Sequence, residues 1–128
     1  METMITCLFI TLLLPYVPRL FTARAQLGMG YNNHEPRTQQ SRLTGLGARA
    51  LGAHNNSFEA LQLFTAAAFI AYTTQADPAI AARLSVGFVA CRVAYIALYL
   101  LDKPSARSTI WVIGFAATVA LAGAKWIF

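Results

Sequence analysis

The sequence predicts an all-α integral membrane protein, a single domain of four transmembrane helices that covers residues 1–128. Of the 128 residues, 57% are hydrophobic and only 12% are charged, whereas a soluble domain has about 25% charged residues. The apolar residues also fall into four stretches, at about 4–21, 46–72, 79–101 and 108–128. A helix needs about 20 apolar residues to cross a bilayer. Four stretches of about this length therefore predict a four-helix bundle in a membrane.

The first stretch contains Pro15 and Pro18, so we expect its helix to kink or unwind near its end. A cleaved signal peptide is the alternative, with residues 8–14 as its apolar core and Ala23-Arg24-Ala25 as the cleavage site. The leading residues Met1-Glu2-Thr3 lack the basic charge of a signal peptide. We therefore expect this stretch to remain as a span.

Residues that commonly start or end helices mark the other boundaries. The second stretch is apolar only from Ala60 onward. Asp77-Pro78 predicts the start of the third helix, since Asp is a favoured N-cap and proline suits the first helical position. Lys103-Pro104-Ser105 predicts a short turn into the fourth helix. The polar segment 26–45 is the one long loop, and it is too short to form a second domain.

Basic residues predict the orientation. With four spans, the first and third loops share one side of the membrane, and both termini share the other with the second loop. The side with the first and third loops carries most of the basic residues: Arg24, Arg37, Arg42, Lys103 and Arg107, with Arg49 close by. The other side has only Arg83 and Lys125. The positive-inside rule then places both termini outside the cytoplasm. We expect a bacterial inner-membrane protein whose net charge of +5 reflects this bias and contact with membrane lipid, with no role in nucleic-acid binding.

The sequence offers no metal site. Cys7 and Cys91 lie inside apolar stretches without a CxxC partner, which favours buried thiols over a disulfide. His34 and His54 are isolated from other ligand types, and His34 is expected in the loop. Chemistry is therefore expected from other polar residues.

Two helix faces carry polar groups at membrane depth. Spacings of three and four residues place side chains on one face of a helix. Such spacings join Arg49, Gly52, Asn56 and Glu59 in the second helix, and Arg92, Tyr95 and Tyr99 in the third. An unpaired charge in hydrocarbon costs about 2.5–3.5 kcal/mol on insertion scales. Glu59 and Arg92 are therefore expected to pair with each other or with groups of a neighbouring subunit.

A buried pair that only fixes helix packing is one interpretation of these faces. A ligand pocket is the other. The amide, the two phenols and the several arginines exceed what one packing pair requires, and ionisable groups inside a membrane usually serve function. The pattern therefore favours a ligand pocket.

The same residues resemble a known family. The run 49–59 (RALGAHNNSFE), followed by 61–64 (LQLF), is similar to the second-helix motif of the MAPEG superfamily, the membrane-associated proteins in eicosanoid and glutathione metabolism. The third-helix run 92–99 resembles that family's Arg-x-x-Tyr-x-x-x-Tyr, and Arg107-Ser108 falls where members have an arginine. The loop sequence 32–37 (NNHEPR) resembles the bacterial branch. The resemblance covers residues from about 32 to the end.

The resemblance implies a homotrimer with a glutathione site at each subunit interface. Asn56 and Glu59 would hold the peptide, Tyr99 would lie near it, and Arg107 would stabilise its thiolate. The candidate set comprises the catalytic residues Arg107 and Ser108 and the glutathione-binding residues Arg49, Asn56, Glu59, Arg92, Tyr95 and Tyr99.

Gly52 and Asn55 depart from that pattern, because glutathione-using members typically have an arginine where Gly52 stands, and some also have one at Asn55. Each lost arginine removes charge-assisted hydrogen bonds of about 1.5–3 kcal/mol. Two functions therefore stay open. One is a glutathione-dependent transferase or peroxidase acting on membrane-soluble electrophiles or lipid hydroperoxides. The other is a non-catalytic protein of the same fold that binds lipid or packs into a larger membrane complex.

Overall fold

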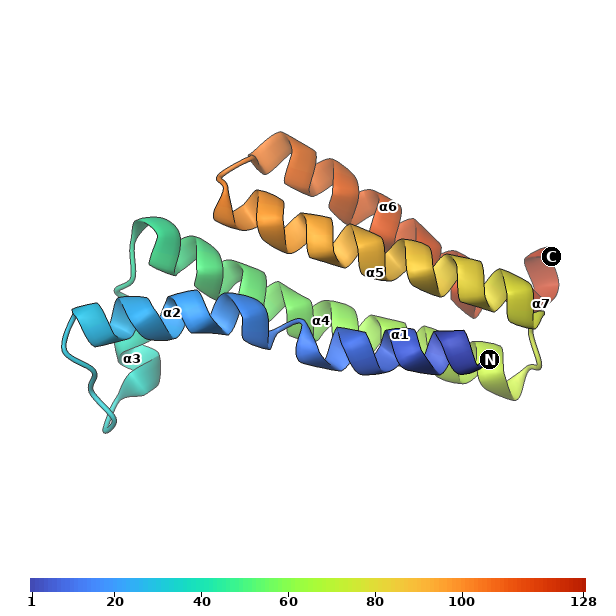
Figure 1. The fold of residues 1–128 in the computed structure, drawn as a ribbon, viewed down its shortest axis with the longest axis horizontal. Coiled ribbons are helices and arrows are strands. Elements are labelled where there is room, and N and C mark those ends of the chain that lie inside the picture. The colour runs from blue at the N-terminus through green and yellow to red at the C-terminus, as the bar shows by residue number, and fades with distance from the viewer.

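The chain folds into an elongated bundle of helices and has no strand (Figure 1). A computed structural model describes all residues, 1–128. Its helices are α1 (Glu2–Leu13), α2 (Tyr16–Gly28), α3 (Pro36–Gln40), α4 (Gly45–Thr73), α5 (Pro78–Leu100), α6 (Pro104–Ala122) and α7 (Ala124–Ile127). The pair α1–α2 forms one long rod, and α4, α5 and α6 form three more beside it. The all-helical prediction is confirmed.

The rod formed by α1 and α2 is interrupted at Leu14 and Pro15, where the prolines predict a kink. The interruption lies in the middle of the rod and not near its end, because the helix resumes and continues to Gly28. Pro15 and Pro18 each lack the N–H that a helix needs for its ladder. The His54 ring on α4 lies 2.7 Å (Nδ1) from the Pro15 carbonyl oxygen. A carbonyl can only accept, so His54 donates this bond, and α4 supports the kink.

The helix starts agree with the sequence rules at α5. The Asp77 side chain accepts hydrogen bonds of 2.9 Å from the backbone N–H groups of Ala79 and Ile80, and Pro78 is the first helical residue. The fourth apolar stretch was predicted from residue 108, but α6 begins four residues earlier at Pro104. Proline is favourable at that position because its missing N–H would be unpaired there in any case.

Three helical rods are long and apolar enough to cross a membrane, namely Glu2–Gly28, Pro78–Leu100 and Pro104–Ala122. Helix α4 has 29 residues and lies alongside them, but it is not among the three. Its first half carries the polar residues Arg49, His54, Asn56 and Glu59. The structure therefore bears out a membrane protein with three clear candidate spans, whereas four were predicted.

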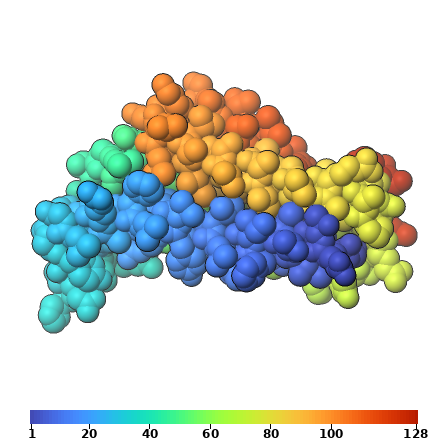
Figure 2. Space-filling model, viewed as in Figure 1, coloured from blue at the N-terminus to red at the C-terminus, as the bar shows by residue number.

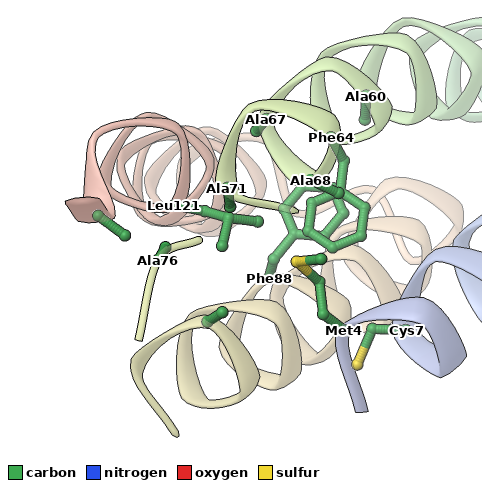
Figure 3. Packing of buried hydrophobic residues seen from close by; sticks show 12 residues of the cluster. Met4, Cys7, Ala60, Phe64, Ala67, Ala68, Ala71, Ala76, Phe88 and Leu121 are labelled. Atoms are coloured by element: carbon green, nitrogen blue, oxygen red, sulfur yellow. The ribbon is translucent and has the colours of Figure 1, made fainter. Parts of the chain in front are cut away.

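The apolar core lies toward the end of the bundle that holds both termini (Figures 1 and 3). Phe64 of α4 and Phe88 of α5 stack at its centre, with ring centroids 4.2 Å apart. Met4 and Cys7 of α1 and Leu121 of α6 pack around these rings. Small residues of α4 (Ala60, Ala67, Ala68 and Ala71) let the neighbouring helices approach closely.

The loop between α2 and α4 projects beyond the helices at the opposite end (Figure 2). Three buried glutamines hold it there. Gln26 donates 3.2 Å to the Pro36 carbonyl, Gln39 donates 2.7 Å to the Gly30 carbonyl, and Gln40 donates 3.3 Å to Gln26. These glutamines thus bond to one another and to backbone carbonyls of the loop, and they tie the loop to α2.

Candidate functional site

A small pocket of about 50 Å³ opens between α4, α5 and α6. Three of its lining residues, Asn56, Glu59 and Arg92, are among the residues predicted from helical spacing. The rest of its wall is mostly apolar and aromatic: Ala60, Leu63, Phe88, Trp111, Gly114, Phe115 and Thr118. Such a mixture, with a few polar groups in an apolar wall, is typical of ligand sites.

Asn56 connects the two charges that were expected to pair with each other. Its Oδ1 accepts a 3.0 Å hydrogen bond from Nη2 of Arg92, and its Nδ2 donates a 2.9 Å bond to Oε2 of Glu59. Arg92 and Glu59 form no ion pair, and Arg49–Asp102 is the single salt bridge in the subunit. The expected direct pairing is therefore replaced by an amide that serves as donor on one side and acceptor on the other.

Arg92 is buried, with 4% of its surface exposed, and has no carboxylate partner within the subunit. Besides Asn56 it reaches the Ser57 hydroxyl at 3.5 Å, and its guanidinium lies 4.2 Å from the centre of the Tyr95 ring. Neutral acceptors and an aromatic face thus hold this cation. A positive charge that is buried without neutralisation favours an anionic group nearby.

The aromatic residues continue from this cation toward the α5–α6 turn. Tyr95 and Tyr99 meet edge to face with centroids 5.6 Å apart, and the guanidinium of Arg107 lies 4.2 Å from the centre of the Tyr99 ring. Arg107 is half-buried, and it too forms no salt bridge. The predicted residues Arg92, Tyr95, Tyr99 and Arg107 therefore form one continuous chain of contacts.

Gly52 is where Tyr99 meets α4. A Cβ atom built at position 52 would overlap the Tyr99 hydroxyl oxygen and lie 2.7 Å from its Cζ. By the resemblance, Gly52 stands where glutathione-using members have an arginine. In the structure the end of the Tyr99 side chain occupies the space that a Cβ at position 52 would fill, so any other residue there would displace it.

Arg49 lies one turn before Gly52 and points to the end of α5. Its Nε donates to the Leu100 carbonyl at 3.4 Å, and its Nη1 lies 3.7 Å from Oδ2 of Asp102. Arg49 does not line the pocket. Ser108 follows Arg107 on α6, is exposed, and makes no side-chain hydrogen bond within the subunit.

The wall supplied by α6 was missed by the sequence analysis. Trp111 and Phe115 stack with centroids 5.4 Å apart, and Thr118 follows on the same side. Residues 107, 111, 115 and 118 have helical spacings of four, four and three. That spacing, counted onward from Arg107, is the signal that could have found them.

Two further groups stand apart from the pocket. Cys7 and Cys91 are free thiols; Cys7 is buried as predicted, whereas Cys91 on α5 is only half-buried. No three metal-binding side chains come together in the subunit. His54 belongs to the contact with Pro15 and stacks edge to face on Phe58, with centroids 5.1 Å apart.

Comparison with family models gives one match. The model described as MAPEG family matches residues 3–125, nearly the whole chain. The chain belongs to the MAPEG family. No match is found among curated proteins or among solved structures. MAPEG membership agrees with the three apolar helices, and it is consistent with a role in glutathione-related or lipid metabolism.

Proposed function

We propose that this MAPEG protein is a glutathione-dependent transferase or peroxidase whose site is the groove of α4, α5 and α6. The observation that carries the proposal is the charge balance of this groove. Glu59, an exposed carboxylate, and two guanidiniums without an acidic partner, Arg92 and Arg107, lie along one path of contacts. Glutathione has an ammonium, carboxylates and an ionisable thiol: the ammonium is complementary to Glu59, a carboxylate to Arg92, and the thiolate to Arg107.

The groups of the groove are suited to separate tasks. Glu59 accepts from Asn56 with one oxygen and is otherwise exposed, so it is free to accept from the ligand's ammonium. The buried Arg92 gives the groove its positive charge. Arg107 uses one face of its guanidinium for Tyr99, and its N–H groups remain available for an anion. Ser108, on the next position, could add a hydroxyl donor.

Arg107 is proposed to stabilise the sulfur anion. A free thiol has a pKa of about 8.5, and a neighbouring guanidinium lowers it, which increases the thiolate fraction near neutral pH. In a transferase reaction the thiolate forms a carbon–sulfur bond and the electrophile's leaving group departs. In a peroxidase reaction two thiols become a disulfide while a lipid hydroperoxide becomes an alcohol and water. Acceptors of both kinds would reach the groove from the bilayer.

A second copy of the chain would complete the site. Pockets for small ligands usually have about 300–1,000 Å³, and the pocket within one subunit has about 50 Å³. Glu59 is exposed at its edge. We therefore propose a homotrimer, as the family resemblance suggests, in which the neighbouring subunit covers this groove.

The proposed membrane arrangement has four spans, with α4 as the fourth. Both termini and the α4–α5 turn lie at one end of the bundle, and the α2–α4 loop and the α5–α6 turn lie at the other (Figure 1). The second end carries the greater number of loop cations, including Arg37, Arg42 and Lys103. The positive-inside rule then supports termini outside the cytoplasm of a bacterial inner membrane.

Titration calorimetry of the purified protein with glutathione tests the proposal. We expect binding in the micromolar to millimolar range, and Glu59→Gln should weaken it by about 1.5–3 kcal/mol because a charged acceptor is lost. Glu35→Gln, in the exposed loop, is the matched control. Arg107→Ala should leave binding largely intact and raise the pH at which the ultraviolet signal of the bound thiolate appears. If folded wild-type protein shows neither heat nor thiolate signal at millimolar glutathione, the enzyme proposal is wrong.

Lipid binding, alone or within a larger membrane complex, is the second candidate. A groove of about 370 Å³ between α1 and α4 supports it, with an almost wholly apolar lining: Ile5, Leu8, Phe9, Leu12, Leu61 and Thr65. Such a groove suits an acyl chain or an apolar helix. Co-purified lipid that resists delipidation, together with absent glutathione binding, would favour this candidate.

A further inference from the structure

Arg49 and Asp102 join the start of α4 to the short turn between α5 and α6. Arg49 contacts two groups at once: the carbonyl of Leu100, the last residue of α5, at 3.4 Å, and the carboxylate of Asp102 in the turn at 3.7 Å. The last carbonyls of a helix lack partners within the helix. The Arg49 side chain therefore caps α5 and pairs with the turn in a single arrangement.

The backbone between these contacts and Arg107 is short and hydrogen-bonded, so the position of the turn and the position of Arg107 are linked. It consists of residues 101–103, and backbone bonds close it on both sides: Lys103 N–H donates to Leu98 at 2.9 Å, and Arg107 N–H donates to Lys103 at 3.0 Å. Asp102 has a left-handed backbone, with φ of 57°. Whatever holds Asp102 in place therefore also holds the first turn of α6, which carries Arg107.

The face of α4 that carries Arg49 also contacts Tyr99, the side chain on which Arg107 stacks. Gly52 lies one turn after Arg49, and the end of the Tyr99 side chain packs against it. The guanidinium of Arg107 stacks on the Tyr99 ring. Arg107 itself forms no salt bridge. Its position thus depends on two supports, the Tyr99 ring and the turn that Arg49 fixes.

We propose that Arg49 is a positioning residue, and that its contacts with Leu100 and Asp102 form a latch that sets Arg107 over Tyr99. This role rests on the proposed function, in which Arg107 faces the thiol. It differs from the direct ligand contact that the sequence suggests for Arg49. In the latch, Asp102 is the permanent anionic partner of Arg49, so the ligand's carboxylates are not.

Hydrogen exchange of the full-length protein in detergent, read on peptides that cover residues 98–108, tests the latch without any ligand. Asp102→Asn removes the charge and keeps a residue type that tolerates left-handed backbone. Asp102 is 69% exposed in its side chain, so this variant does not threaten the fold. We expect exchange about two to five times faster in Asp102→Asn and in Arg49→Gln, the size expected for a half-exposed ion pair. Lys103→Gln, a charge removed from the same turn, is the control.

The double variant should exchange no faster than the faster single variant, because both remove the same contact. Unchanged exchange in Asp102→Asn, or an equal rise in Lys103→Gln, would overturn the latch.

Glutathione provides the second readout. With the latch, Asp102→Asn leaves affinity unchanged or lower and raises the pH at which the bound thiolate appears. Tighter binding by Asp102→Asn would mean that a freed Arg49 contacts the ligand directly, which would overturn the positioning role. If wild-type protein binds no glutathione, the proposed function fails, and the exchange experiment still decides whether the latch exists.

Discussion

The Tyr99 side chain lies directly against Gly52, so close that a single methyl group on α4 would overlap its hydroxyl oxygen. This contact fixes how near α5 lies to α4 at the level of the site. It also orients the ring on which Arg107 stacks. A glycine that departs from the family pattern is thus matched to the tyrosine opposite it.

Gly52→Ala is expected to be about 1–3 kcal/mol less favourable than Gly87→Ala, because both gain about 0.5–1 kcal/mol of helix propensity and only position 52 is overpacked. The outer part of Tyr99 must move, and its stacking with Arg107 is lost as it does. Thermal unfolding in detergent measures the cost. Gly87→Ala is the matched control, because nothing lies within 4 Å of a Cβ at that position of α5. In a Tyr99→Ala background Gly52→Ala should cost nothing, and an undiminished cost there would contradict the contact.

Asn56→Leu is expected to destabilise the fold by about 1.5–3 kcal/mol, because it removes a hydrogen bond to the buried charge of Arg92. Replacing the cation as well should recover much of this loss, since an apolar pair needs no partner. Unfolding of Asn56→Leu, Arg92→Met and the double variant gives the comparison. Strictly additive losses would show that the two side chains act independently.

His54→Ala should lower stability by about 0.5–1.5 kcal/mol, the usual contribution of one hydrogen bond. The lost bond is the one to the Pro15 carbonyl at the break between α1 and α2. His34→Ala, in the exposed loop, serves as the reference and should change nothing. Hydrogen exchange in residues 14–20 should rise only in the His54 variant, and equal effects of both histidines would refute its role at the kink.

Cysteine labelling tests the proposed orientation. In a Cys7→Ala, Cys91→Ala background, Thr38→Cys lies in the exposed part of the long loop and Ala79→Cys lies at the exposed start of α5. With both termini outside the cytoplasm, an impermeant maleimide should modify position 79 in intact cells and position 38 only after permeabilisation. The reverse pattern would invert the topology.

Local signals predicted much of the fold. The Asp77-Pro78 start of α5 and the all-helical class follow from side-chain chemistry within a few residues. The polar faces of α4 and α5 follow from helical spacing, and Asn56, Glu59 and Arg92 indeed line one pocket.

Features that depend on how two helices meet could not be read in this way. The overlap of Gly52 with Tyr99 depends on the register of α5 against α4. The bridge through Asn56 requires Arg92 of α5 to lie level with Asn56 and not with Glu59, which is three residues further along α4. The contribution of Trp111 and Phe115 required α6 to face the same groove. The α1–α2 rod continues past its prolines, and the contact that accompanies the break joins His54 to Pro15, 39 residues away in sequence.

Residues 1 and 128 lie at the same end of the bundle (Figure 1). Copies of the chain can therefore be joined in tandem by a flexible linker that stays on one side of the membrane, without an added span. In a protein made of three linked copies, a single Arg107→Ala or Glu59→Gln can be placed in one copy and its neighbours left intact. If each site draws residues from two adjacent copies, placing the two substitutions in the same copy or in adjacent copies would inactivate different numbers of sites. Because the two chain ends lie on the same side, linked copies can therefore show how many sites an assembly has and which copies contribute residues to each site.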